Sequence, residues 1–424
     1  MTPQIKQRIE QIRRGEVPEG YKKTKAGTIP FEWDLHPLSK HLIESRIPGT
    51  NGAIAKKLTV KLWNKGVFEK REVHEGSEST TYYKRKSGQL IYSKLDFLNC
   101  AFGIIPEHLD GYESTQDLPC FDVKGVIPNY LLTYVTQRNF YMHFGMIADG
   151  GRKARRVGPE DMLSFPLVYP PLAEQEKIAE ILQTQDKLIE LQQMKIDELK
   201  RLKKVYLSKM FPKKGCNVPE IRFPGFTAPW EQRKLEDYLS VSNEKNTSDV
   251  YGRADVLSVS GDFGIVNQIE FQGRSFAGAS VSNYGVVQTG DVVYTKSPLN
   301  SNPYGIIKTN KGKAGIVSTL YAVYHPRETV FPDFVQVYFE QHARMNNYMH
   351  PLVNKGAKND MKVSAENALK GPVCFPSYAE QRTISAFFSV LDNLITLHQR
   401  KLDEEQKRKK ALMQLLLTGI VRVN

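Results

Sequence analysis

A long internal repeat constrains the fold of this chain more than any other feature of its sequence. Laid on itself at a distance of about 200 residues, the 424-residue chain matches itself in the same order along most of its length. Four blocks carry the match: Trp33 and Leu38 with Trp230 and Leu235; Tyr92, Lys94, Gly103, Ile104 and Ile105 with Tyr294, Lys296, Gly305, Ile306 and Ile307; Gly111, Ser114, Thr115, Val126 and Pro128 with Gly315, Ser318, Thr319, Val330 and Pro332; and Ala173, Glu174 and Gln175 with Ala379, Glu380 and Gln381. The distance grows only from 197 to 206 residues, which predicts a tandem duplication.

Each copy begins with a part whose pattern is typical of strands. Residues 27–166 and 222–372 are rich in Gly, Pro, Tyr, Val and Thr, with short apolar runs between turn residues. Short helices are expected within these parts at residues 129–138 and 333–345, where apolar residues recur at helical spacing after Pro-Asn or Pro-Asp. Each first part is therefore predicted to be an α+β globule.

Each copy continues with a long helical part. Residues 173–210 contain no Gly or Pro, and apolar residues recur there every seven positions, as they do again in the second copy after an S-x-x-E capping box at Ser377 and Glu380. The predicted apolar seam consists of Leu182, Ile189, Ile196, Leu199, Phe388, Leu391, Ile395 and Leu402. Heptads on both helices predict an antiparallel coiled coil within the chain. Lys203 and Lys409 interrupt the seam, and we expect their stems to lie along it with the ammonium groups in water.

The predicted fold class is α+β, with two tandem-duplicated α/β-mixed domains separated by a long intramolecular antiparallel coiled coil. The predicted segments are an N-terminal helical segment (1–26), a first globular domain (27–166), a first long helix (167–214), a second globular domain (215–372) and a second long helix (373–424). A helix of this length is a strut of roughly 55 Å, so the two globules are expected at its opposite ends. Such pseudo-two-fold symmetry suits a duplex read as two half-sites, and because the globules differ in sequence the target should be asymmetric.

The charge of the chain favours a polyanionic partner. Lys and Arg number 59 against 46 Asp and Glu, a formal net charge of +13, although solubility is an alternative reason for this surplus. The four cysteines lie far apart and form no metal-ligand spacing, so neither a disulfide framework nor a zinc site is expected. Apolar stretches fall short of the ~18 residues of a membrane span and no secretory signal is present, so we expect a cytoplasmic location.

Basic and polar residues in Gly-rich or aromatic-flanked loops are the candidates for DNA contact, because phosphate contacts position a protein while Arg, Lys, Asn and Gln read base edges. The candidates are Lys84, Arg85, Lys86, Lys94, Arg152, Lys153, Arg274, Lys296, Asn300, Asn302, Lys311, Lys313, Lys355 and Lys358. Lys94 and Lys296 are the preferred pair because they share a position in the repeat. For each residue alone, a solvated surface side chain is the alternative. No catalytic or metal-binding residue is predicted.

The segments that enter the long helices carry a family resemblance. They read Tyr169-Pro170-Pro171-Leu172-Ala173-Glu174-Gln175-Glu176-Lys177-Ile178 and Phe375-Pro376-Ser377-Tyr378-Ala379-Glu380-Gln381-Arg382-Thr383-Ile384. With the duplicated layout, residues 218–226 and residues 230–235, they make the sequence resemble the specificity subunit of type I restriction-modification systems over essentially its whole length.

The resemblance implies that the β-rich parts are target recognition domains, each reading one half of a bipartite DNA site. It implies that the long helices set the spacing and dock two modification (methyltransferase) subunits, with restriction (translocase/nuclease) subunits in the full complex. The chain is then a non-catalytic DNA-binding subunit without a cofactor of its own, and S-adenosylmethionine, ATP and Mg are expected in the partner subunits only.

Two further surfaces are candidates for partner docking. Residues 195–214 contain eight Lys or Arg and residues 400–410 contain six, although such charge runs are equally typical of solvated helix faces. Residues 5–13 are expected to form a short amphipathic helix beside the end of the second long helix.

Two alternative functions belong to other classes. A self-contained adenine methyltransferase or nuclease is disfavoured because an acidic or Asn residue before Pro-Pro-aromatic and a phosphate loop are both absent from the sequence. Asp333 and Glu340 resemble nuclease carboxylates, but Asp333 is expected at a helix start, and His398 on the seam is expected to pack rather than bind a ligand. The other alternative is a coiled-coil scaffold that binds only proteins. Titration with the methyl donor tests the first alternative, and the salt dependence of DNA binding tests the second.

Overall fold

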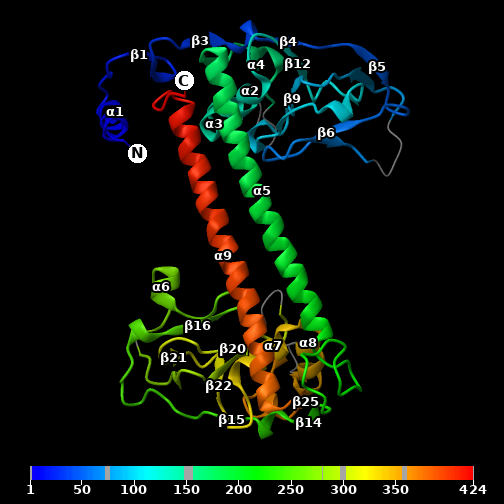
Figure 1. Ribbon diagram of the computed structural model, residues 1–424, viewed down its shortest axis with the longest axis vertical. Coiled ribbons are helices and arrows are strands. Elements are labelled where there is room, and N and C mark those ends of the chain that lie inside the picture. The colour runs from blue at the N-terminus through cyan, green and yellow to red at the C-terminus, as the bar shows by residue number, and fades with distance from the viewer. Residues whose placement is uncertain are drawn as a thin grey trace. The chain divides into compact units, whose positions relative to one another are not determined.

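The computed structural model describes residues 2–71, 77–147, 156–278, 280–296, 302–355 and 361–423. The chain forms two compact units, unit 1 with Met1–Leu191 and Lys401–Asn424, and unit 2 with Gln192–Arg400. The two long helices are α5 (Leu172–Lys209) and α9 (Tyr378–Leu416), and part of each helix belongs to unit 1 and part to unit 2 (Figure 1).

Unit 1 is a mixed α/β unit built on a four-stranded antiparallel sheet. Besides the long helices it contains α1 (Pro3–Arg13), β1 (Tyr21–Thr24), β2 (Gly27–Pro30), β3 (Asp34–Pro37), β4 (Leu42–Glu44), β5 (Pro48–Asn51), β6 (Leu58–Val60), β7 (Val67–Glu69), β8 (Thr81–Lys84), β9 (Leu90–Tyr92), β10 (Phe102–Ile104), β11 (Glu113–Ser114), β12 (Cys120–Val123), α2 (Pro128–Val135), α3 (Arg138–Ile147), α4 (Pro159–Ser164) and β13 (Pro166–Tyr169).

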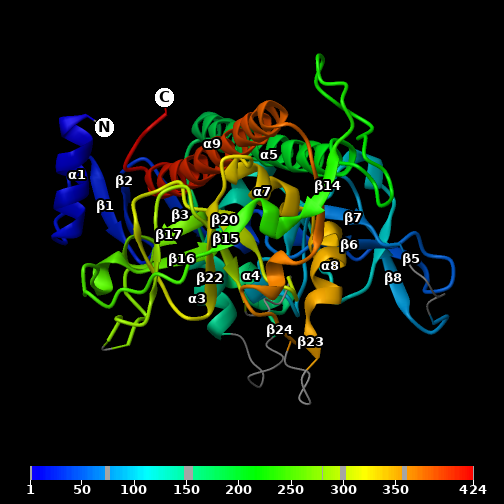
Figure 2. The ribbon, with the colours of Figure 1, turned by 90° about the horizontal axis from the view of Figure 1, so that it is seen from below.

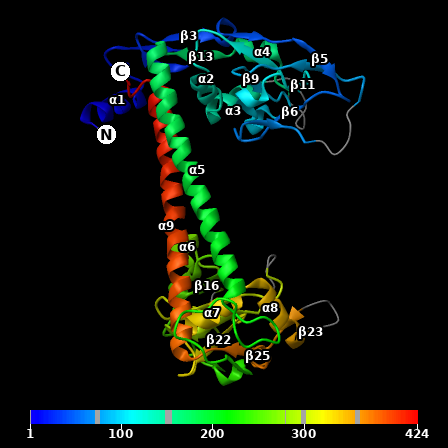
Figure 3. The ribbon, with the colours of Figure 1, turned by 45° about the vertical axis from the view of Figure 1, so that its right-hand side comes forward.

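The core of unit 1 is aromatic. The ring of Tyr92 lies against Phe97, Phe102 and Phe121, and the first turns of α5 add Ile178 to the same cluster. Edge-to-face and offset ring pairs of this kind add to the free energy gained by burying their apolar area. Figure 3 shows α2 and α3 beside β9, on the side where this core lies.

Unit 2 contains a second four-stranded antiparallel sheet. Its elements are β14 (Glu231–Lys234), β15 (Leu239–Val241), β16 (Leu257–Ser260), β17 (Gly264–Asn267), α6 (Gln268–Gln272), β18 (Gly285–Val287), β19 (Val292–Thr295), β20 (Ile307–Thr309), β21 (Gly315–Val317), β22 (Tyr321–Pro326), α7 (Pro332–Glu340), α8 (His342–Met349), β23 (Asn354–Lys355), β24 (Met361–Lys362) and β25 (Pro372–Phe375). In Figure 2 α7 lies against β20, and Phe334 of α7 packs with Phe211, Trp230 and Phe375 in one core.

The two sheets have the same strand order. In unit 1 the order is β10-β9-β12-β4, and in unit 2 the elements at corresponding places in the repeat give β20-β19-β22-β15. The two-stranded pairs also correspond, because β13 pairs with β3 as β25 pairs with β14. The four-stranded sheets and these pairs therefore share one arrangement, whereas the three-stranded sheet β11-β8-β5 of unit 1 corresponds to no three-stranded sheet in the described part of unit 2.

Two of the predicted short helices differ from the observed ones. The helix predicted at 333–345 is two helices, α7 and α8, because Gln341 between them has an extended backbone (φ −73°, ψ 114°). The helix predicted at 129–138 ends at Val135, and α3 begins a new helix at Arg138. The hydroxyl of Thr136 donates to the carbonyl of Leu132 at the end of α2, which favours a break there.

The long helices lie side by side within each unit and run in opposite directions. In unit 1, Gln185 of α5 donates to Glu405 of α9, and Lys409 pairs with Asp186. In unit 2, Nδ1 of His398 donates to the side-chain oxygen of Gln192 at 2.8 Å, as expected of a packed residue. Leu182, Ile196, Leu199, Phe388, Leu391 and Leu402 are buried, and Ile189 and Ile395 are half-buried.

The expectation that the ammonium of Lys203 lies in water is wrong. Its Nζ lies 2.6 Å from Glu340 and 2.5 Å from Asp392, so it joins α5 to α7 and α9 inside unit 2. These two carboxylates raise the pKa of Lys203 although burial acts against the charge. The carboxylates replace water as the partners of the buried ammonium.

Candidate nucleic-acid interface

Lys94 and Lys296 occupy equivalent places in the two units. Each residue follows the strand at the same position in its sheet, β9 or β19. The Lys94 amide donates to the carbonyl of Asp117 and the Lys296 amide to that of Leu320, both at 3.0 Å. Both side chains are half-buried, and burial together with the nearby Lys245 lowers the pKa of Lys296. The backbone hydrogen bonds fix the two lysines at matching places, and a lysine ammonium there could bind an anion.

The three basic residues that follow Tyr83 separate into two kinds. Lys84 and Lys86 are exposed, but only 2% of Arg85 is exposed. The Arg85 guanidinium donates to the Ser114 hydroxyl and to the carbonyls of Ser45 and Leu118. These bonds hold the guanidinium inside unit 1, so the prediction that Arg85 contacts DNA does not fit its position. Arg85 directly follows the last residue of β8, and its three hydrogen bonds account for its burial between two exposed lysines.

The candidates in unit 2 that are described lie on its surface. Arg274 is exposed and lies over the ring of Phe276, with 4.6 Å to the ring centroid. Lys313 is exposed, Asn302 is half-buried, and Lys311 pairs with Asp333 at 3.0 Å. Arg152, Lys153, Asn300 and Lys358 lie outside the described residues, and of Lys355 only the backbone in β23 is described.

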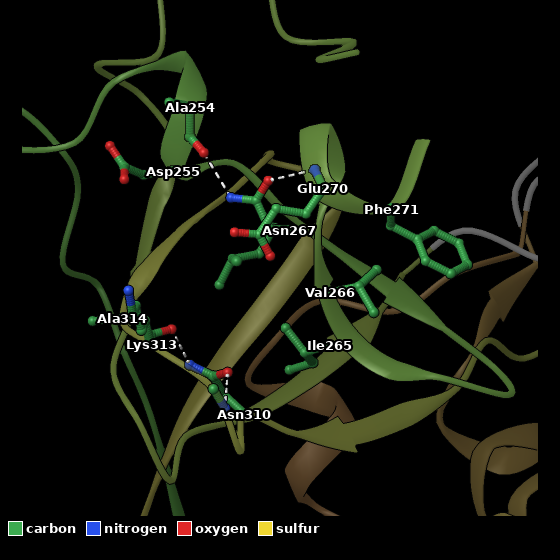
Figure 4. A pocket seen from close by; sticks show the side chains of 12 residues that line it. Ala254, Asp255, Ile265, Val266, Asn267, Glu270, Phe271, Asn310, Lys313 and Ala314 are labelled. Atoms are coloured by element: carbon green, nitrogen blue, oxygen red, sulfur yellow. Dashed lines mark hydrogen bonds between the residues drawn. The ribbon is translucent and has the colours of Figure 1, made fainter. Parts of the chain in front are cut away.

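A hollow of about 560 Å³ opens beside Lys313 in unit 2 (Figure 4). Three of its polar side chains, Asp255, Asn267 and Asn310, hold the local turns. Asn267 caps α6 by accepting from the amides of Ile269 and Glu270, and Asp255 accepts from the amide of Gly252. Asn310 donates to the carbonyls of Gln288 and Lys313. These groups shape a surface loop and do not converge on a point where a substrate atom would react.

A buried Glu–Arg pair fixes the start of each long helix. In unit 1 Glu174 accepts from Arg422 at 2.7 and 2.9 Å and from the indole of Trp33 at 2.9 Å. In unit 2 Glu380 accepts two bonds of 2.7 Å from Arg222. The Glu380 carboxylate therefore binds an arginine and does not complete the predicted capping box with Ser377. Sequence reasoning did not identify the two arginines as partners, although each stands in a similar context, Ile-Arg-Phe or Val-Arg-Val.

The glutamine after each of these glutamates has a matching role. The Gln175 side chain accepts from the amide of Ile127 and donates to the carbonyl of Pro170. The Gln381 side chain accepts from the amide of Phe331 and donates to the carbonyl of Pro376. The Ala-Glu-Gln motif thus joins the start of each long helix to the loop that opens α2 or α7. Its conserved spacing within the chain has a structural cause.

The N-terminal helix α1 meets the segment that follows α9 in unit 1. Arg8 donates to the carbonyl of Ile420 at 2.5 Å, and Tyr21 donates to the carbonyl of Gly419 at 2.7 Å. This contact agrees with the expectation for residues 5–13. Among the described residues, no group of three or more His, Cys, Asp or Glu side chains is arranged to hold a metal ion. No helix in the described parts of the chain is both long and apolar enough to cross a membrane.

Comparison with known proteins gives one consistent result. The family model described as the type I restriction modification DNA specificity domain matches residues 116–201. The putative type I restriction enzyme MjaX specificity subunit of Methanocaldococcus jannaschii is 24% identical, covering 96% of this chain and 97% of its own length. The chain is similar to the specificity subunits of type I restriction-modification systems. The MjaVIII specificity subunit of the same organism is 26% identical over 62% of this chain and 63% of its own length.

Solved structures resemble this chain in fold. The S subunit of a type I restriction-modification system from M. genitalium aligns with a TM-score of 0.52 at 10% identity, over 91% of this chain and 96% of that one. The HsdS subunit from Thermoanaerobacter tengcongensis aligns with a TM-score of 0.43 at 16% identity, over 94% and 100% of the two chains. The likeness to the first of these places this chain in the same mixed α/β fold.

Proposed function

We propose that this chain is the sequence-reading subunit of a type I restriction-modification complex and that each recognition domain reads one half of a bipartite, asymmetric DNA site. The observation that carries the proposal is the repeated topology. Two lobes with one strand order place Lys94 and Lys296 at the same position, while the loops around them differ in sequence. Two sheets with the same strand order but different loops suit two dissimilar half-sites, because base readout depends on the loop side chains.

The long helices form the spacer in this proposal. We propose that α5 and α9 pair as an antiparallel coiled coil inside the duplicated chain and fix the separation of the half-sites. The opposite running directions and the buried seam in each unit support it. The recognition domains are proposed at residues 27–166 and 215–372, with helical segments at 1–26, 167–214 and 373–424.

The helices also offer a surface for partner subunits. Leu188, Leu191 and Met194 of α5 are exposed, as are Val390 and Leu397 of α9. Leu188 and Leu191 belong to unit 1 and the other three to unit 2, so each unit has exposed apolar side chains that a partner could cover. We propose that two modification subunits dock here and that restriction subunits join them in the full complex.

Catalysis is assigned to those partners. We propose that the chain is non-catalytic and acts in the cytoplasm, and that S-adenosylmethionine, ATP and Mg are bound by the modification and restriction subunits. The engagement of the polar side chains around the hollow in unit 2 supports this assignment. The alternatives of a methyltransferase, a nuclease or a protein-only scaffold have no comparable support.

Salt dependence of DNA binding tests the proposal. The full chain, assembled with its modification subunits, is titrated against a duplex carrying the site methylated in the host genome. The logarithm of affinity should fall linearly with the logarithm of salt concentration, because phosphate neutralisation releases counterions. Lys94→Gln and Lys296→Gln should each reduce that slope by about 0.9 if each lysine neutralises one phosphate.

Lys234→Gln provides the control. Lys234 is exposed and pairs with Glu236 at 3.0 Å, outside the candidate set. The slope should not change in this variant. A complex whose DNA affinity is independent of salt would contradict the proposal and favour the scaffold.

A further inference from the structure

The hairpin formed by β6 and β7 in unit 1 ends in a turn that displays a tryptophan. The Lys61 amide donates to the carbonyl of Gly66 at 2.9 Å and closes the hairpin. Between them Trp63 is 58% exposed, and Lys61, Asn64 and Lys65 around it are exposed as well. A single exposed tryptophan beside two lysines differs from the other tryptophans of this chain, Trp33 and Trp230, which are buried.

The backbone of this turn is strained. Trp63 and Asn64 have φ of 60° and 53°, in the left-handed region that bulky side chains rarely adopt. Asn64 tolerates this conformation, but for tryptophan it is unfavourable. Because the Trp63 side chain is exposed, packing of that side chain in the core cannot be what compensates for the strain. Strain of this kind at an exposed residue indicates a functional constraint.

Two hydrogen bonds hold the strained turn to the body of unit 1. The Trp63 amide donates to the carbonyl of Asn99, and the Asn64 amide donates to the carbonyl of Cys100, both at 2.8 Å. Cys100 is itself left-handed (φ 52°) and buried, and the Asn99 side chain donates to Asp96. Three of the four non-glycine residues with left-handed φ in the described part of the chain therefore meet here. These hydrogen bonds fix the backbone that carries the indole.

The second anchor is the close approach of β7 to β10. A Cβ at Gly103 of β10 would lie 2.5 Å from a methyl carbon of Val67, the first residue of β7. The absence of a side chain at Gly103 lets the hairpin pack against the four-stranded sheet. The tip is thus held at two places, by the hydrogen bonds of the turn and by the packing of β7 against β10.

Unit 2 has a hairpin at the corresponding place in the chain, with a shorter turn and a different aromatic residue at its tip. In sequence Leu58 and Val67 match Leu257 and Val266 of β16 and β17, although Val67 pairs with Val60 in the first hairpin and Val266 pairs with Ser258 in the second. In each unit the residue before the hairpin bridges in parallel to an equivalent strand, Lys57 to Glu113 and Val256 to Ile316. At the tip of the second hairpin Phe263 is 63% exposed, and its ring centroid lies 5.1 Å from that of Phe271. Figure 1 labels the first strand of each hairpin, β6 in unit 1 and β16 in unit 2.

We propose that these two tips are DNA-contacting elements, in which Trp63 and Phe263 stack on a base or deoxyribose of the half-site that their lobe reads. This inference rests on the proposed function and adds to it an apolar contact in each lobe. A two-stranded ribbon fits the major groove, and apolar side chains inserted at a base step are a known way to position a duplex. Lys61 and Lys65 give the first tip the charge that suits phosphates on either side of the ring.

Fluorine NMR can observe the first tip directly. The full chain is labelled with fluorotryptophan and assembled with unlabelled modification subunits, so that only Trp33, Trp63 and Trp230 give signals. The Trp63 signal is identified by its loss in Trp63→Phe. A duplex that carries the site methylated in the host genome should shift the Trp63 signal and leave the signals of the two buried tryptophans unchanged. A Trp63 signal that responds to the modification subunits alone, and not to DNA, would overturn the proposal in favour of a protein interface.

A binding measurement separates stacking from charge and from folding. Trp63→Asn removes the ring and places a residue that tolerates left-handed φ, so the melting temperature should stay the same or rise. DNA affinity should fall by roughly 5- to 100-fold, the effect of one lost aromatic–base stack, while the salt slope stays constant because no charge is lost. Phe263→Ala should likewise lower DNA affinity, in this case through the loss of a contact with the other half-site.

The matched control is Phe31→Asn. Phe31 is 70% exposed and lies near Lys22, as Trp63 lies near lysines, but it is outside the hairpin. Its substitution should not change DNA affinity. Undiminished affinity in Trp63→Asn would refute the stacking contact alone, whereas a wild-type complex that binds no DNA would refute the proposed function instead.

Discussion

His41 shows how one buried side chain makes unit 1 sensitive to pH. Its imidazole stacks on Tyr169 at 4.5 Å, and Nδ1 lies 3.2 Å from the carbonyl of Lys124, so the neutral ring donates there. Nε2 is buried and has no hydrogen-bond partner among the described atoms. Burial is the main cause that lowers the pKa of His41, and the nearby His36 and Lys40 act in the same direction.

The stability of unit 1 should therefore decrease in mild acid. The unfolded chain binds a proton at the ordinary histidine pKa near 6.5, whereas the folded chain resists it to lower pH. Stability from this group is complete above that pH and is lost as the pH falls from it toward the lower folded pKa. Denaturant unfolding followed from pH 8 to pH 5 should show a smaller loss in His41→Phe than in the wild type. Identical pH profiles would contradict the assignment.

Sequence reasoning at this scale identifies residue types better than their exposure. Lys84, Arg85 and Lys86 were predicted together because they are adjacent and basic, yet only the central one lies inside the lobe. The side of a strand that faces the core depends on its pairing, which the sequence alone does not define. Gly103 and Gly305 show the same limit. Gly103 lies within β10, whereas Gly305 precedes β20 with φ of 76°, so the two matched glycines are not structurally equivalent.

At the scale of elements, the contact of Arg222 with Glu380 in α9 should be sensitive to substitution. Only 1% of Glu380 is exposed, and its carboxylate lies in the first turn of the helix, where the helix dipole also favours negative charge. Both of its oxygens bind Arg222. A buried carboxylate without this partner would have to be desolvated alone.

Arg222→Met should accordingly destabilise unit 2 by about 3 kcal/mol or more, the cost of leaving a buried charge unpaired. Replacing both residues, as Arg222→Met with Glu380→Met, should recover part of that loss because no buried charge remains. Arg233→Met is the control, since its pair with Glu231 is exposed and weak. Chemical unfolding measures all three variants. A double variant less stable than the single one would show that the pair is not the cause.

The long helices are the elements that the sequence predicts best. The observed helix Leu172–Lys209 lies within the predicted segment 167–214, whose first residues belong to β13, and it matches the run without Gly or Pro, 173–210, within a residue at each end. The absence of Gly and Pro and a regular apolar period leave few alternatives there. The hairpin β6–β7 and its strained tip are not predictable in this way. Their geometry depends on hydrogen bonds to Asn99 and Cys100, which are distant in sequence.

At the scale of the whole molecule, each unit has a core of its own. The cluster around Phe334 and Phe388 draws only on residues of unit 2, and the cluster around Tyr92 only on residues of unit 1. Exchanging residues 222–372 for those of a relative should therefore leave the folding of unit 1 intact. If readout is modular, methylation mapping should find a change in one half of the target site. A change in both halves would contradict independent reading.

Unit 1 is built from two separate stretches of the chain, and this determines when it can form during synthesis. Its core includes Leu416 and Leu417, and Glu174 obtains its arginine from residue 422. All residues of unit 2 leave the ribosome before these three do. The first lobe to be translated is thus the last to be completed, and until then its apolar surface depends on chaperones or on transient burial for protection from aggregation.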